Sequence, residues 1–280
     1  MRLGLLSLVI ALSLFGADAS AATLDRIKKS GVVKIAYRVD AAPYSYKNAI
    51  GEPSGYTVDL CRAVTASLKG QLGLQKISIE YVPVTAENRF EMIQQGRADM
   101  LCGATTATLS RRALIDFSLP VFVDGASVLF RAAGPKSFED LAGHKIGVRA
   151  GTTTEEALGN TLEDLALNAQ VVAVSNHDDG LQKLETNEIS AYFADQAILL
   201  FLMIKSKSPK ELRLSKRFFT HEPYAVGLPH GDSDFRLAVD RALSRIYRTG
   251  AIKPIFGKNF GAATPSSIVK ALYLISALPE

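Results

Sequence analysis

The segment from residue 98 to 120 combines residue types that bind small anions. An apolar, strand-like run is followed by a glycine, by the hydroxyl residues Thr105 and Thr106, and then by Arg111. The planar guanidinium of arginine matches the geometry of a carboxylate. Threonine hydroxyls and free backbone N–H groups would add further donors. This order of residues predicts a carboxylate site at the end of a buried strand.

A second group of donors lies at the start of a predicted helix. Gly151, Thr152 and Thr153 follow another strand-like run, where a helix N-terminus offers free N–H groups to an anion. The Gly-Lys-Ser/Thr ending of a nucleotide-binding loop is missing. Asp195 ends a further strand-like run and adds one carboxylate. Anion donors that face a single acid suit a zwitterion such as an α-amino acid, although each residue alone could be a solvated charge or a helix cap.

Alternating strand and helix patterns would position these groups. Strands are predicted at 32–38, 77–84 and 127–132, and amphipathic helices at 56–70 and 233–250. Repeated β-α-β units with short connections favour a parallel sheet covered by helices. The pattern restarts near residue 125, which indicates two α/β units. Because such sheets bind ligands at the carboxyl ends of their strands, two facing units would form a cleft that closes by hinge motion.

The predicted organisation has five parts. Residues 1–22 read as a signal peptide cleaved after Ala21, because a positive start and a short apolar stretch precede small residues at Ala-x-Ala spacing. A membrane anchor is the alternative. The chain is expected to return to the first unit after the second one, because the strand-like residues 224–230 could rejoin the first sheet. The remaining predicted segments are lobe 1 at 23–122 and 223–262, lobe 2 at 123–222, and a tail at 263–280 that packs back on a lobe or contacts a partner.

Composition argues against several classes of function. The net charge is +4 with 32 basic and 28 acidic residues interspersed, so nucleic-acid binding is not expected. The four histidines show no metal-ligand spacing, and neither a metal nor a cofactor is predicted. The only cysteines are Cys61 and Cys102. In an exported protein they could form a disulfide, or they could be two small buried apolar residues.

Several segments in order resemble one known family. The sequence resembles the polar amino-acid-binding proteins of bacterial ABC importers, which are extracellular solute-binding proteins of family 3. The resemblance implies an α/β, two-lobed type II periplasmic fold with a two-segment hinge. It is strongest to glutamate/aspartate and general L-amino-acid binders. The segments that carry it are TLDRIKKSGVVKIAYR, GYTVDLCRAV, GRADMLCGATTATLSRRALIDFS, DLAGHKIGVRAGTTTEEAL, AYFADQAILL and IYRTGAIKPIFGKNFG.

The resemblance implies roles for the residues at the strand ends. Arg111 would grip the ligand α-carboxylate, and Thr105 or Thr106 would assist. Thr152 and Thr153 would offer helix-start donors to the same carboxylate. Asp195 would hold the α-ammonium.

The choice of ligand side chain would rest on other residues. The resemblance places Arg38, Arg89 and His177 around a distal carboxylate. Arg89 could instead be a surface charge, and His177 a helix cap. Ala86 and Ala104 stand where glutamate/aspartate binders carry serines, which puts strict selectivity in doubt. Tyr44, Tyr46 and Phe90 are available to stack on the ligand, and Tyr46 and Phe90 could instead belong to the core.

These expectations describe a receptor rather than an enzyme. The predicted protein is a periplasmic monomer that binds an acidic or broadly polar L-amino acid and delivers it to a membrane ABC permease. A dehydratase acting on prephenate or arogenate is the alternative on the same fold, with His177 or Glu87 as the acid/base. A sensor that reports ligand to a membrane kinase is a third possibility.

Overall fold

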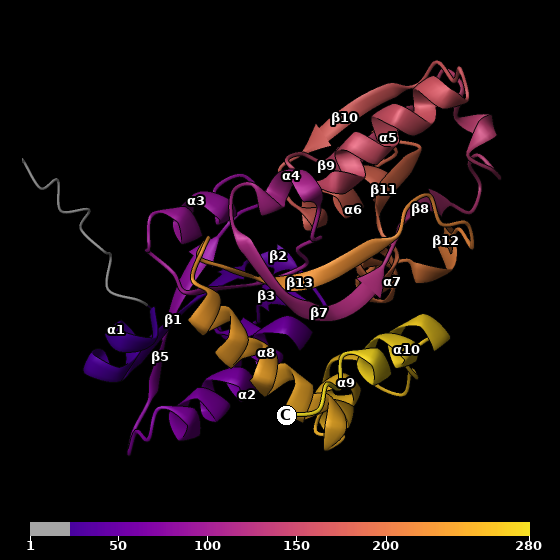
Figure 1. The fold of residues 1–280 in the computed structure, drawn as a ribbon. Helices are drawn as coiled ribbons and strands as arrows, with labels where there is room; N and C mark the ends of the chain where they lie inside the picture. Colours follow the sequence, from indigo (N-terminus) through magenta and orange to yellow (C-terminus); the bar gives the residue numbers. More distant parts are fainter. Residues whose placement is uncertain (1–22) are drawn as a thin grey trace, which may run out of the picture.

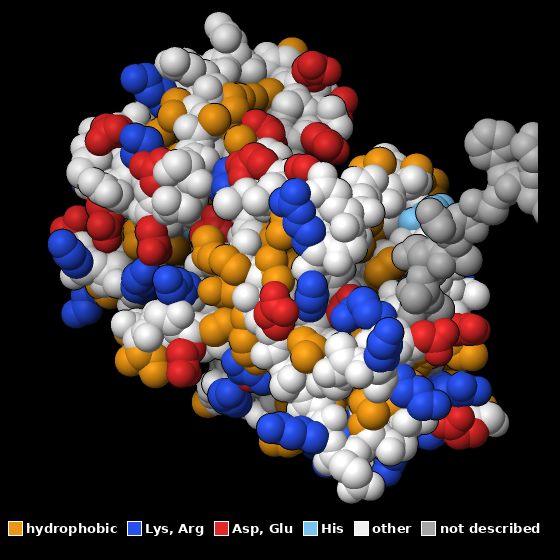
Figure 2. Space-filling model, turned by 90° about the vertical axis from the view of Figure 1, so that its left-hand side faces the viewer, with side chains coloured by type: hydrophobic (Ala, Val, Ile, Leu, Met, Phe, Trp, Pro, Cys, Tyr) orange, Lys and Arg blue, Asp and Glu red, His pale blue; other side chains and the backbone are white. Residues whose placement is uncertain are grey.

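The structure, a computed structural model, describes residues 23–280 and contains two five-stranded sheets with helices packed against them (Figure 1). The predicted signal peptide lies outside the described residues. None of the helices within 23–280 is long and apolar enough to cross a membrane. Lys and Arg side chains are interspersed with Asp and Glu side chains on the face in Figure 2.

The first sheet has the strand order β5-β1-β6-β13-β7 and, with its helices, is called lobe 1. Strand β1 is parallel to β5 and β6, whereas β13 is antiparallel to β6 and β7. The sheet is therefore mixed, and the repeated β-α-β pattern predicted only its parallel part, β5-β1-β6. The chain returns from the other lobe through β13 and so enters this sheet in the opposite direction. Its strands are β1 (Val32–Arg38), β5 (Ser78–Val84), β6 (Met100–Cys102), β7 (Asp116–Asp124) and β13 (Glu222–Leu228).

The other elements of lobe 1 surround this sheet. A small antiparallel sheet follows β1 and consists of β2 (Asp40–Ala41), β3 (Ser45–Lys47) and β4 (Pro53–Ser54). The helices are α1 (Thr23–Ser30), α2 (Tyr56–Gln71), α3 (Arg89–Gln94), α4 (Leu109–Arg112), α8 (Ser233–Arg248), α9 (Ile252–Phe260) and α10 (Ser267–Ile275).

The second sheet has the order β10-β9-β11-β8-β12 and forms lobe 2 with its helices. Here β8 is antiparallel to both β11 and β12. The strands are β8 (Ala126–Arg131), β9 (Lys145–Arg149), β10 (Gln170–Val174), β11 (Ala191–Asp195) and β12 (Leu212–Leu214). The helices are η1 (Glu139–Leu141), α5 (Thr153–Asp164), α6 (His177–Glu185), α7 (Gln196–Lys205) and η2 (Pro209–Glu211).

Helix α8 illustrates how the sequence pattern becomes packing. Its apolar residues recur at helical spacing, and Phe235, Val239 and Leu243 are buried in the core of lobe 1. Asp232 is the N-cap, and its carboxylate accepts a hydrogen bond from the Phe235 N–H at 3.1 Å.

Two chain crossings connect the lobes. Strand β7 ends at Asp124 and β8 begins at Ala126, so the first crossing is a single glycine. A Cβ atom on Gly125 would lie 2.3 Å from the carbonyl oxygen of Thr220 on the returning crossing. The two crossings therefore pack backbone against backbone, and only glycine permits this approach. Residues at or just after the ends of β1, β6, β9 and β11 line a cavity between the lobes.

The C-terminal tail packs on lobe 1. Helix α10 lies against β7 and α8, and its Val269 and Leu272 are buried. The hydroxyl of Tyr273 lies 2.7 Å from that of Tyr56 on α2.

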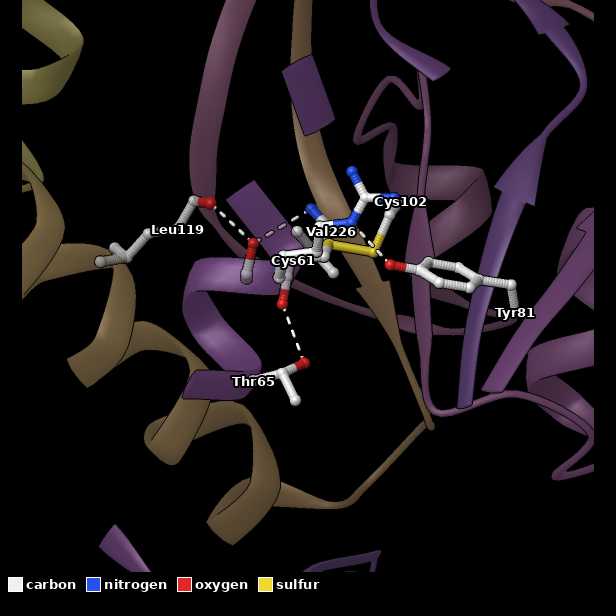
Figure 3. Close-up of a disulfide and its surroundings, with 8 residues drawn as sticks. Cys61, Thr65, Tyr81, Cys102, Leu119 and Val226 are labelled. Carbon is white, nitrogen blue, oxygen red and sulfur yellow. Dashed lines mark hydrogen bonds between the residues drawn. A yellow bond between two sulfur atoms is a disulfide. The ribbon is translucent and has the colours of Figure 1, made fainter. Parts of the chain in front are cut away.

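A disulfide joins Cys61 on α2 to Cys102, the last residue of β6 (Figure 3). Of the two possibilities that the sequence left open, the structure thus has the covalent bond. Both cysteines are fully buried. The Thr65 hydroxyl donates to the Cys61 carbonyl at 2.9 Å and holds the helix turn beside the bond. The bond therefore fixes the strand end from which the Thr105–Thr106 segment continues.

Replacing both cysteines with alanine should lower the free energy of unfolding by about 2–4 kcal/mol, because the bond closes a loop over 41 residues of sequence separation. Urea unfolding of the oxidised protein and the double variant measures this. Reductant should lower the stability of the wild type and leave the variant unchanged. Two titratable thiols in unreduced wild type would contradict the expectation.

Candidate functional site

A cavity between the lobes brings together most of the predicted site residues. Every residue predicted to bind ligand lines it except Thr105. The lining residues are Arg38, Ala41, Arg89, Ala104, Thr106 and Arg111 from lobe 1 and Thr152, Thr153, Thr154, His177, Asp195 and Ile198 from lobe 2. The cavity therefore exists only where both lobes contribute.

Arg111 is a mostly buried arginine on α4. Thr108 caps this short helix, and the Arg111 guanidinium donates to the Thr106 carbonyl at 3.1 Å. Its guanidinium also lies 5.2 Å from the Phe90 ring centre, a cation–π contact. Burial lowers the pKa of Arg111, and the negative charge of Glu222 partly offsets this. Among residues 23–280 the guanidinium makes only that one hydrogen bond, so further N–H donors remain for an anion.

Thr106, rather than Thr105, faces the cavity. The Thr106 hydroxyl donates to Glu222 at 2.6 Å and lies 3.3 Å from the Thr153 hydroxyl of the opposite lobe. Thr105 is fully buried, and its carbonyl accepts a hydrogen bond from the Ala225 N–H at 3.1 Å. The segment after β6 is thus fixed to β13 by its backbone while one hydroxyl faces the cleft.

The start of α5 supplies the donors expected from lobe 2. Thr152 is the N-cap, and its hydroxyl oxygen accepts a hydrogen bond from the Glu155 N–H at 3.2 Å. The Thr153 hydroxyl donates to Glu222 at 2.9 Å. The helix N-terminus therefore points a positive dipole end at the cavity.

Asp195 lies in a group of three acidic side chains. Burial raises the pKa of Asp195 well above its usual value, and the charges of Asp124 and Glu222 raise it further. Burial likewise raises the pKa of Asp124 to about 6, although its carboxylate accepts a hydrogen bond from the Tyr44 hydroxyl at 2.7 Å. A cation placed beside Asp195 would relieve this mutual repulsion.

Arg89 is a buried charge in the same cavity, not the surface charge that the sequence left possible. It is 1% exposed and donates to the carbonyls of Gly151, at 3.2 Å, and Ala86. Its Nε is buried without a hydrogen-bond partner among the described residues. Burial, together with the positive charges of Arg38 and Arg111, lowers the pKa of Arg89 to about 8. An anion here would compensate a costly charge.

Within the described part of the chain, Arg38, unlike Arg89, is paired with a carboxylate of the protein. Its Nε and Nη2 lie 2.9 Å and 2.7 Å from the Asp40 carboxylate, so part of its charge is already paired. Gly103 lies beneath its side chain, because a Cβ there would be 3.0 Å from the Arg38 Cγ.

His177 is the first residue of α6, but the helix cap is Asn176, which accepts a hydrogen bond from the Asp179 N–H at 2.8 Å. The His177 Nδ1 lies 2.7 Å from the Tyr192 hydroxyl. Burial lowers the pKa of His177 to about 4, so the ring is neutral at pH 7. When the tyrosine hydroxyl donates to Nδ1, the ring proton is on Nε2 and can be donated to an anion.

The remaining residues singled out from the sequence lie in different places. Tyr44 is in the core, and Tyr46 packs 5.9 Å from Phe201 across the cleft. Phe90 lies under the guanidinium groups of Arg89 and Arg111. Among residues 23–280, no group of three or more His, Cys, Asp or Glu side chains could hold a metal ion.

Sequence reasoning missed four charged residues around the cavity. Arg149 ends β9 in KIGVR just as Arg38 ends β1 in KIAYR, so the strand-end rule that selected Arg38 would have found it. Asp40, Asp124 and Glu222 carry no comparable signal. They reach the site only because distant segments meet at the cleft.

The chain is also similar to known proteins over most of its length. The sequence profile of the bacterial extracellular solute-binding proteins, family 3, matches residues 33–262. An L-glutamate/L-aspartate-binding protein of Pseudomonas aeruginosa is 31% identical over 251 residues, which cover 89% of this chain and 83% of that protein.

Solved structures are similar over most of the chain. An ABC uptake transporter substrate-binding protein of Streptococcus pneumoniae with bound histidine superposes with a TM-score of 0.79 at 18% identity, covering 89% of this chain and 100% of that one. An ancestral amino acid-binding protein, a precursor of cyclohexadienyl dehydratase, gives a TM-score of 0.72 at 26% identity, covering 86% and 100%. The two-lobed type II periplasmic fold is thus shared.

Asp195→Asn should stabilise the ligand-free protein at pH 7 by about 1 kcal/mol or more, because it removes a buried charge that Asp124 and Glu222 repel. The pKa of Asp195 is raised in the folded state, so wild-type stability falls as pH rises above the unfolded value near 3.8. The gain should therefore grow as pH increases from 4 to 8.

Urea unfolding at several pH values measures this gain. Asp178→Asn is the matched control, since the Asp178 side chain is 67% exposed and its replacement should change stability little. Equal stability of Asp195→Asn and wild type at every pH would contradict the assignment.

Proposed function

Because the chain belongs to the bacterial extracellular solute-binding proteins, family 3, we propose that it is a receptor that binds an L-amino acid between its lobes and delivers it to a membrane ABC permease. In this proposal it acts in the periplasm as a monomer and needs no cofactor. The observation that carries the proposal is the pair of opposite charges in the cleft, with Arg111 facing an anion site and Asp195 facing a cation site.

The two ends of this arrangement fit what all amino acids share. Arg111 and the N-terminus of α5 bind the α-carboxylate, with Thr106 and Thr153 fixed beside them by Glu222. Asp195 pairs with the α-ammonium, which also offsets the repulsion from Asp124. Since Arg111 and Asp195 come from different lobes, the ligand is held best when the cleft is closed.

The distal end of the cavity favours an acidic side chain. Arg89 is a buried guanidinium with an unpartnered Nε in the described part of the chain, and neutral His177 can donate from its free ring nitrogen. Ala104 lines the cavity without a hydroxyl and leaves it less specific in shape. The relative from Pseudomonas aeruginosa, named for glutamate and aspartate, supports the same ligand class.

The dehydratase alternative is not favoured. Both oxygens of Glu87 are hydrogen-bonded to Arg149, and this lowers the pKa of Glu87 to about 2, which makes it a poor general acid near neutral pH. His177 has Nδ1 on Tyr192 and remains neutral. The relative from Pseudomonas aeruginosa, which matches most of the chain, is named as a binding protein.

Arg111→Ala should weaken every amino-acid ligand by at least about a hundredfold, because a charged hydrogen bond to the shared α-carboxylate is lost. Titration calorimetry with the twenty amino acids, first on wild type and then on the variant, tests this. Arg112→Ala is the control, since Arg112 is the exposed neighbour on the same short helix. Tight binding retained by Arg111→Ala would overturn the site.

Arg89→Met should weaken the binding of glutamate and aspartate more than that of glutamine and asparagine. The ratio of the amide's dissociation constant to the acid's should fall roughly tenfold. The physical reason is the loss of the buried guanidinium opposite the distal carboxylate. The same calorimetric titrations measure both ligand pairs. An unchanged ratio of the two dissociation constants would show that Arg89 does not determine the preference for an acidic side chain.

A further inference from the structure

Arg149 is a buried arginine that joins the two lobes without lining the cavity. It is the last residue of β9, and its side chain is 5% exposed. Its Nη1 and Nη2 lie 2.5 Å and 3.1 Å from the two carboxylate oxygens of Glu87. Its Nε lies 3.3 Å from the Asp40 Oδ2 atom. Glu87 and Asp40 both belong to lobe 1, so one side chain of lobe 2 binds two acids across the cleft.

These two acids stand next to the arginines that face the cavity. The other oxygen of Asp40, Oδ1, is the one that binds Arg38. Glu87 precedes Arg89 by two residues, and its charge acts on the pKa of Arg89. Without Arg149, neither acid would have a positive partner outside the cavity among the described residues, and both negative charges would act on the cavity arginines alone.

The charge balance at this end of the cavity depends on Arg149. Three guanidinium groups, those of Arg38, Arg89 and Arg149, stand against the carboxylates of Asp40 and Glu87, which leaves one net positive charge. His177 is neutral and does not change this balance. Removing Arg149 would leave two positive and two negative groups, which cancel.

We propose that Arg149 determines ligand selectivity from behind the cavity, by engaging Asp40 and Glu87 so that a net positive charge remains for an anionic ligand side chain. The inference rests on the proposed amino-acid function. It differs from a purely mechanical role. An ion pair that only held the lobes together would strengthen every ligand equally, whereas a charge effect distinguishes an acid from its amide.

The test compares glutamate with glutamine, or aspartate with asparagine, by calorimetry. Each amide has the shape of its acid and lacks the charge. Arg149→Met should lower the preference for the acid by on the order of tenfold, because the charge of the buried Arg149 side chain acts over several ångströms. Arg149→Lys, which keeps the charge, should retain most of the preference.

A double variant separates charge from mechanics. Arg149→Met with Glu87→Gln still lacks the cross-cleft pair but regains one net positive charge. It should recover the preference for the acid while both ligands bind more weakly than to wild type. The control is Arg217→Met, since Arg217 pairs with Glu139 on the exposed surface of lobe 2.

The outcomes distinguish the two proposals. If Arg149→Met weakens acid and amide equally, or if the double variant does not recover the preference, Arg149 has only a mechanical role and this inference is wrong. If folded wild-type protein binds no amino acid, the proposed function itself fails, and the inference fails with it. Thermal unfolding of each variant confirms that it is folded.

Discussion

Buried charges that are not neutralised within the protein are the constraint on which the cleft depends. Arg89 and Arg111 are buried, and the partly exposed Asp195 lies beside the buried acids Asp124 and Glu222. A buried charge is stable only when it is paired. The lowered pKa of Arg89 and the raised pKa of Asp195 both record this unmet pairing. A zwitterion supplies opposite charges in the right order, so closure around it satisfies both ends at once.

The fold is the means of holding these groups apart until a ligand joins them. Parallel strands deliver Arg38 and the Thr106 segment from one lobe, and the Thr153 segment and Asp195 from the other. Glu222, at the second crossing, accepts hydrogen bonds from Thr106 and Thr153 and thereby connects both lobes at the hinge. The packed glycine at the first crossing keeps the two connections close together. A residue at the carboxyl end of one of these strands therefore lies at the cleft.

Local sequence patterns predicted much of this arrangement, whereas features that depend on contacts between distant segments could not be predicted. The spacing of apolar residues and the residues at the ends of each segment predicted β1, α2 and α8. The rule that ligands bind at the carboxyl ends of strands selected Arg38 and Asp195. The antiparallel entry of β13 depends on where a distant crossing returns, which no local pattern encodes. The choice between Thr105 and Thr106 depends on which hydroxyl Glu222 reaches. The family resemblance supplied the roles that the residue types alone left open.

The two proposals together imply two kinds of recognition. In the proposed receptor, groups that line the cavity recognise the ligand's shape and common charges, whereas Arg149, Asp40 and Glu87 act from outside the cavity. A charge outside the cavity changes the potential inside it without changing the contact surface, because electrostatic interaction falls off slowly where water is excluded. Selectivity can therefore be altered at Arg149 while the carboxylate and ammonium sites remain intact. Under this proposal, the choice among amino acids rests partly on residues that do not line the cavity.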